Sequence, residues 1–342
     1  MRIETIRARS PLWAEFVGAH PDATPFHLPQ WMSVIADCYG FDSFILAALG
    51  KSGELLAGIP IIPIRPPFGT RRWVSLPFTD SCALLARSGV DTAEVAQACQ
   101  RFLDKSGIRE CVVRSPLPEL PGLHPVTVGY QHTIGLPDDS SALRIRKSMR
   151  NLRNRAQRDG ITVTLGESAA DVGAYYRLHA LTRQRLGVPV QPRRFFQLIA
   201  EGLIAEGHGF VAHALLDGEI LASGIYLKHN RVVVAKFGAS HPDHRDQGAG
   251  VLLDWEVALR SCAEGHTVLD LGRTDLDAEG LRRYKNGLGA QEAPLVYTHL
   301  SERAPKQQTA TASGDRFSRW AIKQSPLWVC RAAGELLYRW VA

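Results

Sequence analysis

The stretch GFVAHALLDGEILASGIYLKHNRVVVAKFGAS, residues 209–240, decides the fold, because it reads as three strands in succession. Apolar residues dominate it, and the pairs Asp217-Gly218 and His229-Asn230 are typical of tight turns between strands. We therefore predict an antiparallel meander of three strands. A helix at 248–265 (GAGVLLDWEVALRSCAEG) and a buried strand at 267–272 (TVLDLG) are expected to follow it.

The segment before the meander is predicted to be mainly helical. Asp139 or Ser140 is placed to cap a helix that runs to about Arg158 and stops at Asp159-Gly160. ITVTLGE at 161–167 reads as a strand, and two further helices are expected at 172–187 and 193–207. Helices, an antiparallel meander and then strand, loop, helix and strand form the order of a GNAT domain. The predicted fold class is α/β (α+β).

The first 130 residues also alternate helices and strands. Helices are expected at 28–40 and 91–107, and strands at 41–49, 53–64, 71–78 and 108–116. We predict four parts: a first domain at 1–131, a second at 132–300, a polar linker at 301–315 and an amphipathic helical tail at 316–342. The tail is expected to pack on the first domain, and its Trp and Arg residues also suit peripheral contact with an anionic membrane.

Composition indicates a folded protein of a reducing compartment. Of the 342 residues, 45% are hydrophobic and 22% charged, which is ordinary for globular proteins. The six cysteines are scattered without a C-x-x-C pair. The first residues contain no apolar signal-peptide core, and no stretch reaches the roughly 18 apolar residues of a membrane span. We therefore expect a cytoplasmic protein.

Positive charge is concentrated in one short segment. The net charge is +6, and residues 144–158 carry seven Arg or Lys and no acid. Such cations repel one another, and an anionic ligand would offset that cost, although a solvated helix face is the alternative. Four of them are candidates for binding phosphate or tRNA: Lys147, Arg150, Arg153 and Arg158.

A second candidate site is the loop HRDQGAG at 244–250, which contains the pattern R-x-x-G-x-G. Glycines that lead into a helix allow backbone N–H groups to approach an anion, and the helix dipole favours negative charge. The candidate residues are Arg245, Gln247, Gly248, Ala249 and Gly250. The alternative is that the glycines only permit tight packing. His241 and His244 lie three apart, but the sequence shows no third ligand, so no metal site is predicted.

The third candidate site combines LDLGRT at 269–274 with GLRRYKNGLG at 280–289. A strand ending in D-x-G, followed by (F/Y)-K-x-x-(F/W/L)-G, resembles the FemAB aminoacyltransferase family and its relatives, a branch of the GNAT superfamily. Other family-like stretches are SMRNLRNRAQRDGITV at 148–163, LTRQRLGVPVQPRRFF at 181–196, the segment 237–266, GIPIIPI at 58–64 and WVSLPFTD at 73–80.

This resemblance implies two tandem GNAT-like domains with mixed, mostly antiparallel sheets, an active groove between the domains, and transfer of an amino acid from aminoacyl-tRNA to an amine. Lys285 falls on the lysine that stabilises the oxyanion, and Tyr284 is expected to pack beneath the substrate. A surface lysine that neutralises a helix end is the alternative for Lys285. Arg183 and Arg273 are further candidates for binding substrate or tRNA.

Asp80 and Asp270 end expected strands near this groove. Either is able to orient or deprotonate an amine, and capping or turn roles are the alternative. The chain also departs from the cell-wall members of the family, because the four residues after Trp31 (Met32-Ser33-Val34-Ile35) include no cation and no coiled-coil arm interrupts residues 140–240. A nucleotide-linked muropeptide substrate is therefore not favoured.

The reaction predicted from the sequence is direct attack of an amine on an activated carbonyl, with no covalent intermediate and no tightly bound cofactor. Aminoacyl-tRNA is the favoured donor because more of the chain supports it, and acyl-CoA is the alternative. The loop at 244–250 favours acetyl-CoA or another acyl-CoA, whereas the YKxxLG region and the basic helix favour aminoacyl-tRNA. The acceptor is expected to be a small-molecule or peptide amine, and DNA is not an expected partner. A non-catalytic GNAT-like scaffold that binds tRNA or a cell-envelope assembly is the alternative from another class.

Overall fold

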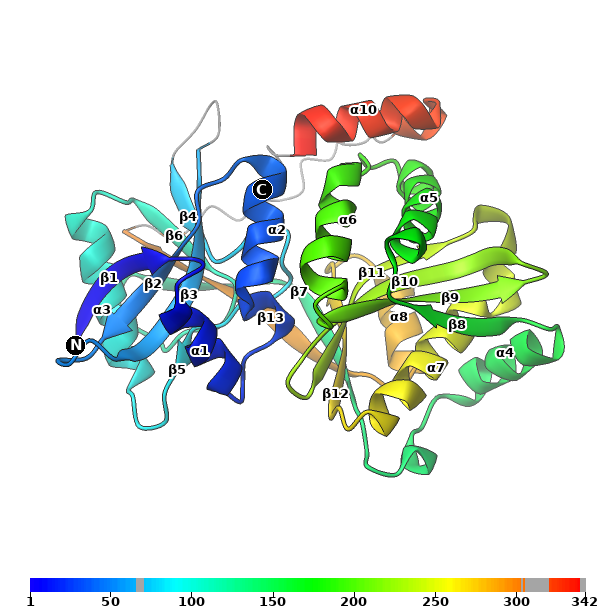
Figure 1. Ribbon diagram of the computed structural model, residues 1–342, viewed down its shortest axis with the longest axis horizontal. Coiled ribbons are helices and arrows are strands. Elements are labelled where there is room, and N and C mark those ends of the chain that lie inside the picture. The colour runs from blue at the N-terminus through cyan, green and yellow to red at the C-terminus, as the bar shows by residue number, and fades with distance from the viewer. Residues whose placement is uncertain (66–70, 303, 305–319, 339–342) are drawn as a thin grey trace. The chain divides into compact units, whose positions relative to one another are not determined.

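The structure is a computed structural model that describes residues 1–65, 71–302, 304 and 320–338, without the side chains of Arg245 and Leu337. These residues form two compact units (Figure 1). Unit 1 holds residues 1–130 together with 294–302 and 304, and unit 2 holds residues 131–293 and 320–338. The sequence analysis placed residues 294–300 in the second domain, whereas their contacts place them in unit 1.

Unit 1 is an α/β unit built on a mostly antiparallel set of strands. Its elements are β1 (Arg2–Arg7), α1 (Pro11–Ala19), η1 (Pro25–His27), α2 (Pro29–Tyr39), β2 (Phe44–Leu49), β3 (Leu55–Ile64), β4 (Arg72–Val74), β5 (Leu85–Ala86), α3 (Thr92–Lys105) and β6 (Glu110–Val113). The ends of two long strands, β7 (Leu123–Gly135) and β13 (Gln291–Ser301), also belong to it. The strands follow the order β1-β2-β3-β4-β6-β13, and β5 pairs with β3.

One expected strand of unit 1 is much shorter than predicted. The stretch 71–78 forms β4 only from Arg72 to Val74. Leu76 and Phe78 have positive φ angles of 61° and 58°, which interrupt an extended backbone. The segment after β4 is therefore a turn, and Thr79 there accepts a hydrogen bond from the indole of Trp31 at 2.8 Å.

Unit 2 contains the predicted meander. Its elements are η2 (Ser140–Ala142), α4 (Lys147–Arg158), β8 (Thr162–Gly166), α5 (Ala169–Leu186), α6 (Arg193–Ile199), η3 (Ala200–Ile204), β9 (Gly209–Leu216), β10 (Glu219–His229), β11 (Val232–Ser240), η4 (Pro242–Gln247), α7 (Ala249–Ala263), β12 (Val268–Thr274), α8 (Glu279–Gly287) and α10 (Leu327–Leu337). The strands follow the order β7-β12-β11-β10-β9-β8. Asp217 and Asn230 turn the meander with positive φ angles of 49° and 50°.

The strands β11 and β12 run parallel, and the hydrogen-bonded ladder between them is short. Their ladder pairs Val232, Val233 and Val234 with residues 268–270, and among the described residues it extends no further. Strand β11 nevertheless continues to Ser240, and β12 continues to Thr274. The backbones of the two strands beyond this ladder are therefore not bonded to each other.

Helices cover both faces of the strands of unit 2 (Figure 1). Helix α5 packs on β9, β10 and β11, while α7 packs on β9 and β10 from the other side and contacts α4. The core on the α7 side includes Phe210 and Tyr226 from the strands and Leu252 and Val257 from α7. This burial of apolar side chains holds α7 and α4 on the sheet.

The basic helix begins later than predicted. The carboxylate of Asp139 accepts a hydrogen bond from the backbone N–H of Ser141 at 2.9 Å, so it caps only the single turn η2. Leu143 and Arg146 are extended, and α4 starts at Lys147. The expected start at 139 or 140 was therefore wrong, because the cap residue serves a separate short helix.

The C-terminal helix α10 contacts α5 and the segment before α6. Gln184 donates to the carbonyl of Ser325 at 2.7 Å, and Glu335 accepts from the backbone N–H of Arg193 at 3.1 Å. These partners belong to unit 2, so the expectation that the tail packs on the first domain is corrected. Residues 303 and 305–315 of the expected linker at 301–315, and the tail residues 316–319 and 339–342, lie outside the described residues.

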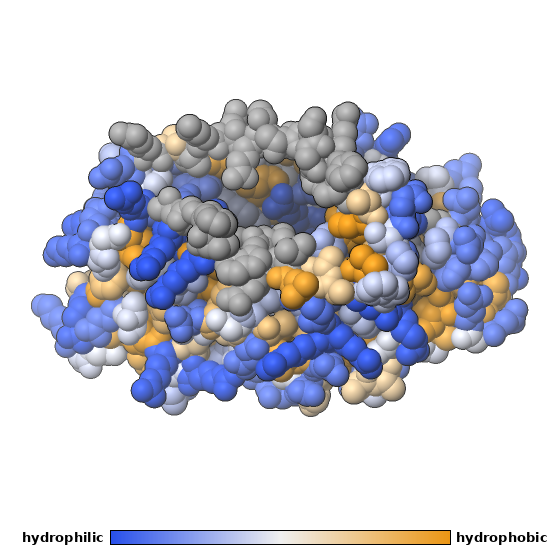
Figure 2. Space-filling view, turned by 90° about the horizontal axis from the view of Figure 1, so that it is seen from above, coloured by the Kyte–Doolittle hydropathy of each residue, from blue (hydrophilic) through white to orange (hydrophobic). Residues whose placement is uncertain are grey.

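Hydrophilic residues make up much of the surface seen in Figure 2, and hydrophobic residues appear there in small groups. Exposed large hydrophobic side chains include Trp320, Trp328 and Leu336 from the C-terminal segment. Across the part of the chain that the structure describes, the helices are too short or too polar to cross a lipid bilayer.

Candidate active site

Lys285 lies on α8 with its side chain buried. Its ammonium group donates to the backbone carbonyl of Gly272 at 2.9 Å and to that of Arg273 at 3.1 Å. Only 6% of the residue is exposed, so the nitrogen is held by the end of β12 rather than by bulk water. This fixes a positive charge where β12 has already separated from β11.

Asp270 shapes the same strand end. Its carboxylate accepts from the backbone N–H of Gly272 and from the side-chain amide of Gln131, both at 2.8 Å. Gly272 has a φ of +71°, a conformation that glycine adopts without strain. The buried carboxylate therefore holds the turn whose carbonyls receive Lys285, which favours the turn role over that of a base.

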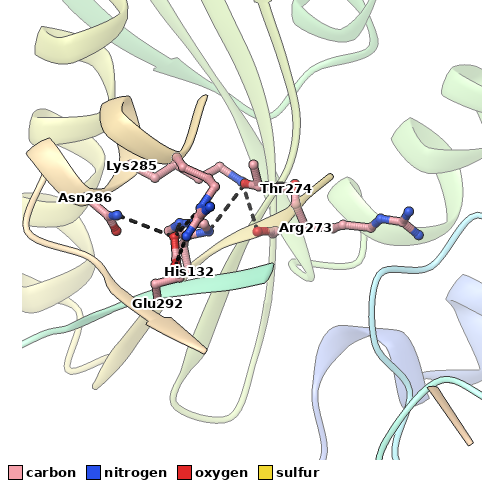
Figure 3. A network of polar contacts seen from close by, with 8 residues as sticks. His132, Arg273, Thr274, Lys285, Asn286 and Glu292 are labelled. Carbon is pink, nitrogen blue, oxygen red and sulfur yellow. Dashed lines mark hydrogen bonds and ion pairs between the residues drawn. The ribbon is translucent and has the colours of Figure 1, made fainter. Parts of the chain in front are cut away.

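A polar network surrounds Lys285 (Figure 3). Glu292 on β13 accepts two hydrogen bonds from the guanidinium of Arg282, at 2.9 and 2.6 Å, and one from the amide of Asn286 at 3.4 Å. These contacts, above all the hydrogen bonds from Arg282, lower the pKa of Glu292 to about 2. The carboxylate is therefore ionised at neutral pH.

His132 on β7 joins Glu292 to the strand end. Its Nε2 lies 3.1 Å from Glu292 Oε2, and its Nδ1 lies 3.3 Å from the hydroxyl of Thr274. Burial lowers the pKa of His132, the positive charge of Lys285 lowers it further, and Glu292 opposes both effects. The imidazole is thus neutral, with Nε2–H donating to the carboxylate and Nδ1 accepting from Thr274.

The glycine loop packs against the basic helix. Gly248 has a φ of +77° and is the N-cap of α7. A Cβ added at Gly248 would lie 2.7 Å from the backbone oxygen of Leu152 in α4, so only glycine fits there. Ala249 is buried in the first turn of α7, and Gln247 contacts His244 at 3.1 Å. The side chain of Arg245 lies outside the described residues.

The basic segment is also joined to α8. The backbone N–H of Arg146 donates to the carbonyl of Gly287 at 2.9 Å, two residues after Lys285. Met149 on α4 packs so closely on Gly287 that an added Cβ would lie 2.7 Å from its methyl carbon. The basic helix, the glycine loop and the helix of Lys285 are therefore neighbours within unit 2.

The cations of α4 fall into two groups. The guanidinium of Arg153 lies 4.6 Å from the ring centre of Trp255, and Arg155 pairs with Asp159 at 3.4 Å. Lys147, Arg150 and Arg158 are exposed, and none of the three is in an ion pair with another residue that the structure describes.

Tyr284 links α8 to α7. Its hydroxyl donates to Asp254 at 2.7 Å, and Tyr226 donates to the same carboxyl group at 3.0 Å. Burial raises the pKa of Asp254, and the two tyrosine hydrogen bonds oppose that shift. The hydroxyl of Tyr284 also lies 3.3 Å from the position of a Cβ on Gly250. Tyr284 therefore packs beneath the glycine loop.

Three other predicted residues, Asp80, Arg183 and Arg273, make side-chain or backbone contacts of their own. The carbonyl of Asp80 accepts from Tyr297, and both residues belong to unit 1. Arg183 donates to the carbonyl of Pro189 at 3.0 Å and to the hydroxyl of Tyr338 at 3.4 Å, which ties α5 to the C-terminal segment. Arg273 points to Asp275, with 2.8 Å between nitrogen and oxygen.

Sequence reasoning missed His132, Thr274 and Glu292. His132 stands between Gln131 and Thr133 near the end of β7, and its partner Glu292 lies 160 residues later in the chain. The only local signal was the spacing of Arg282 and Glu292 on either side of the YKxxLG motif. The pairing of strands far apart in sequence is what brings these groups together.

Comparison with known proteins places these elements in a recognised domain. Residues 144–286 match the family model described as an acetyltransferase (GNAT) domain. This range begins before the basic helix, includes the glycine loop and ends just after Lys285. No curated protein matches the sequence.

Solved structures share the fold over most of the chain. FemX has a TM-score of 0.67 at 14% identity, covering 88% of this chain and 98% of that one. A tandem GNAT protein from the clavulanic acid biosynthesis pathway has a TM-score of 0.52 at 14% identity, covering 89% and 99%. L-PGS from Bacillus licheniformis has a TM-score of 0.51 at 12% identity, covering 90% and 99%.

These findings confirm the expected α/β fold of two GNAT-like parts and the FemX-like resemblance at the level of the fold. A GNAT domain together with these neighbours supports an acyltransferase, in agreement with the coarser part of the sequence prediction.

Proposed function

We propose that this protein transfers an aminoacyl group from aminoacyl-tRNA to an amine and so forms an amide bond. The observation that carries the proposal is the position of Lys285, whose buried ammonium is held by two carbonyls at the end of β12. A cation that is already fixed needs no reorganisation when negative charge develops on a nearby oxygen.

The proposed reaction is a direct displacement. The lone pair of the acceptor amine attacks the carbonyl carbon of the aminoacyl ester, and the carbonyl oxygen becomes an oxyanion near Lys285. The C–N bond forms in this attack. The oxyanion then collapses to restore the carbonyl as the C–O bond to the tRNA ribose breaks, and the departing ribose oxygen takes up the proton that the amine loses. Preorganised donors of this kind typically contribute about 10²- to 10³-fold in rate.

Asp270 and His132 support Lys285 in this proposal. Asp270 holds the turn whose carbonyls bind the ammonium. His132 is held neutral between Glu292 and Thr274, so it adds no second positive charge beside Lys285. Both residues are assigned positioning roles.

The basic helix favours tRNA as the source of the acyl group. Lys147, Arg150 and Arg158 are exposed on α4, which is bonded to the end of α8. Phosphate groups of an RNA backbone are the ligands that such a surface attracts.

The glycine loop favours a second candidate, an N-acyltransferase that uses acyl-CoA. Gly248 opens a helix of 15 residues, and the N-terminus of such a helix attracts a pyrophosphate group. Separate incubations of the purified protein with charged tRNA and with acetyl-CoA, each with a panel of amines, distinguish the two donors. Loss of the aminoacyl ester without loss of the thioester supports tRNA, and the reverse supports CoA.

A scaffold without catalytic activity predicts that neither donor is consumed. In that case charged tRNA would bind and its ester would hydrolyse at the spontaneous rate. For the C-terminal segment, exposed Trp320, Trp328 and Leu336 suit a peripheral membrane contact, which binding to anionic vesicles would test.

A further inference from the structure

Glu219, His241 and His244 form a cluster of metal-ligand residues apart from the surroundings of Lys285. One ligand atom from each lies within 4.8 Å of the other two. His241 Nε2 lies 3.6 Å from one carboxylate oxygen of Glu219, and His244 Nε2 lies 3.9 Å from the other. The sequence showed the two histidines without a third ligand, and the fold provides it.

The hairpin register explains why a residue of β10 reaches the loop. Ala222 is paired with Ser240, so residues that precede 222 lie opposite residues that follow 240. The backbone N–H of His241 accordingly donates to the carbonyl of Leu221 at 2.7 Å. Glu219, at the start of β10, therefore faces the loop that begins at His241.

The short helix η4 brings the two histidines to the same side. His241 is the extended N-cap of η4, and His244, with φ −117° and ψ 21°, lies at a kink within it. The ring centres of His241 and His244 lie 4.9 Å apart. Both Nε2 atoms are turned towards the same carboxylate. For His241 Nε2 to bind a metal, the imidazole proton moves to Nδ1, which gives up the 3.3 Å hydrogen bond that Nδ1 accepts from the N–H of Asp243.

The distances suit a small divalent ion better than a hydrogen bond. At 3.6 and 3.9 Å, the N–O separations exceed hydrogen-bonding range. With metal–ligand bonds of about 2.0 to 2.1 Å, two ligands at a tetrahedral angle are roughly 3.3 to 3.5 Å apart. Small rotations of the partly exposed side chains close that difference.

The ring nitrogen of His244 that faces away from Glu219, Nδ1, has a neighbour that can fix its protonation. The side-chain amide of Gln247 lies 3.1 Å from His244 Nδ1, and Gln247 Oε1 is buried without a hydrogen-bond partner among the described atoms. Rotation of the amide by half a turn places Oε1 against Nδ1 as an acceptor. His244 then carries its proton on Nδ1, which leaves the lone pair of Nε2 for a metal.

We propose that Glu219, His241 and His244 bind one zinc ion, with water in the fourth position. Two imidazoles and one carboxylate form a donor set that zinc readily accepts. The ion would join the start of β10 to the loop that leads to Gly248. It would thereby brace the loop, whichever acyl donor the protein uses.

The test uses the full chain without a polyhistidine tag, stripped of metal with a chelator and titrated with zinc chloride against a chromophoric competitor. We expect one equivalent to bind, and binding to disappear in the double variant H241A/H244A. E219Q is expected to weaken binding by more than the roughly 10- to 100-fold typical of an outer-shell change. Zinc should also raise the melting temperature of the wild type but not that of the double variant.

The matched control is H208A/H229A. These two histidines lie in the same unit with ring centres 6.1 Å apart, and they belong to no three-residue ligand group among the described residues. The control should bind zinc like the wild type. Failure of the wild type to bind one equivalent would overturn the proposal. So would undiminished binding by both E219Q and H241A/H244A, with folding verified by circular dichroism.

Discussion

The ammonium of Lys285 donates a hydrogen bond of 2.9 Å to the backbone carbonyl of Gly272. That contact joins the helix after the D-x-G turn to the strand before it, and it places a positive charge beside the point where β11 and β12 part. Asp270 holds the turn from the other side through the N–H of Gly272. The sequence motif is therefore a single structural unit in the folded protein.

The hydrogen bond between Tyr284 and Asp254 is expected to contribute to stability. Y284F removes a donor 2.7 Å from the partly buried carboxyl group of Asp254, and leaving such an acceptor without its hydrogen bond costs roughly 1 to 3 kcal/mol. Y176F, which removes a contact of 3.5 Å to a carbonyl, is the matched control and should cost less. Urea unfolding of the two variants measures the difference, and an equal loss in both contradicts the assignment.

Gly248 is predicted to tolerate no side chain. G248A combines a left-handed backbone, which costs about 1 to 2 kcal/mol, with a Cβ 2.7 Å from a backbone oxygen of α4. Gly207 has nearly the same φ, +79°, but nothing within 4 Å of an added Cβ. G207A therefore reports the backbone cost alone. Thermal unfolding should show a clearly larger loss for G248A, and equal losses would mean that the packing on α4 is not as described.

The lowered pKa of His179 leads to a prediction of how the free energy of unfolding depends on pH. Burial, followed by the positive charge of Arg183, lowers its pKa to about 3, against about 6.5 in an unfolded chain. The unfolded state binds the extra proton first, so this stabilisation is complete above about pH 6.5 and is lost as pH falls towards 3. The slope is about 1.4 kcal/mol per pH unit within that window. Unfolding at several pH values should show a shallower slope for H179Q, and an unchanged slope contradicts this prediction.

The exposed cations of α4 are expected to bind RNA phosphates. The triple variant K147Q/R150Q/R158Q should weaken tRNA binding and reduce the dependence of log K on log salt by about 0.7 to 0.9 for each phosphate that the protein no longer neutralises. R101Q/K105Q/R109Q removes three exposed cations of unit 1 and is the matched control. Filter binding at several salt concentrations distinguishes them. Equal effects of the two variants would indicate general charge attraction.

Local patterns predicted the parts of the fold that local contacts determine. The meander at 209–240 has the predicted turns because Asp217 and Asn230 adopt the positive φ that such turns require. The start of α4 was misplaced because Asp139 caps a separate turn. The tail was assigned to the wrong unit because its partners, such as Gln184, lie about 140 residues away and leave no pattern in the tail itself.

Of the candidate site, the sequence likewise predicted the residues that lie within short motifs but not those that meet through strand pairing. Lys285 and the glycine loop lie within short motifs, so the sequence revealed them. His132 and Glu292 meet only through strand pairing, and Glu219 reaches His241 only through the register of a hairpin. No local rule identifies such pairs.

The most direct test of the central claim is the single-turnover rate of aminoacyl transfer by K285M, measured beside its affinity for charged tRNA. Methionine has a similar length and no charge, so it fills the space and removes only the cation. We expect the rate to fall by about 10²- to 10³-fold, with tRNA binding and the circular dichroism spectrum unchanged. Transfer by K285M at the wild-type rate would contradict the account.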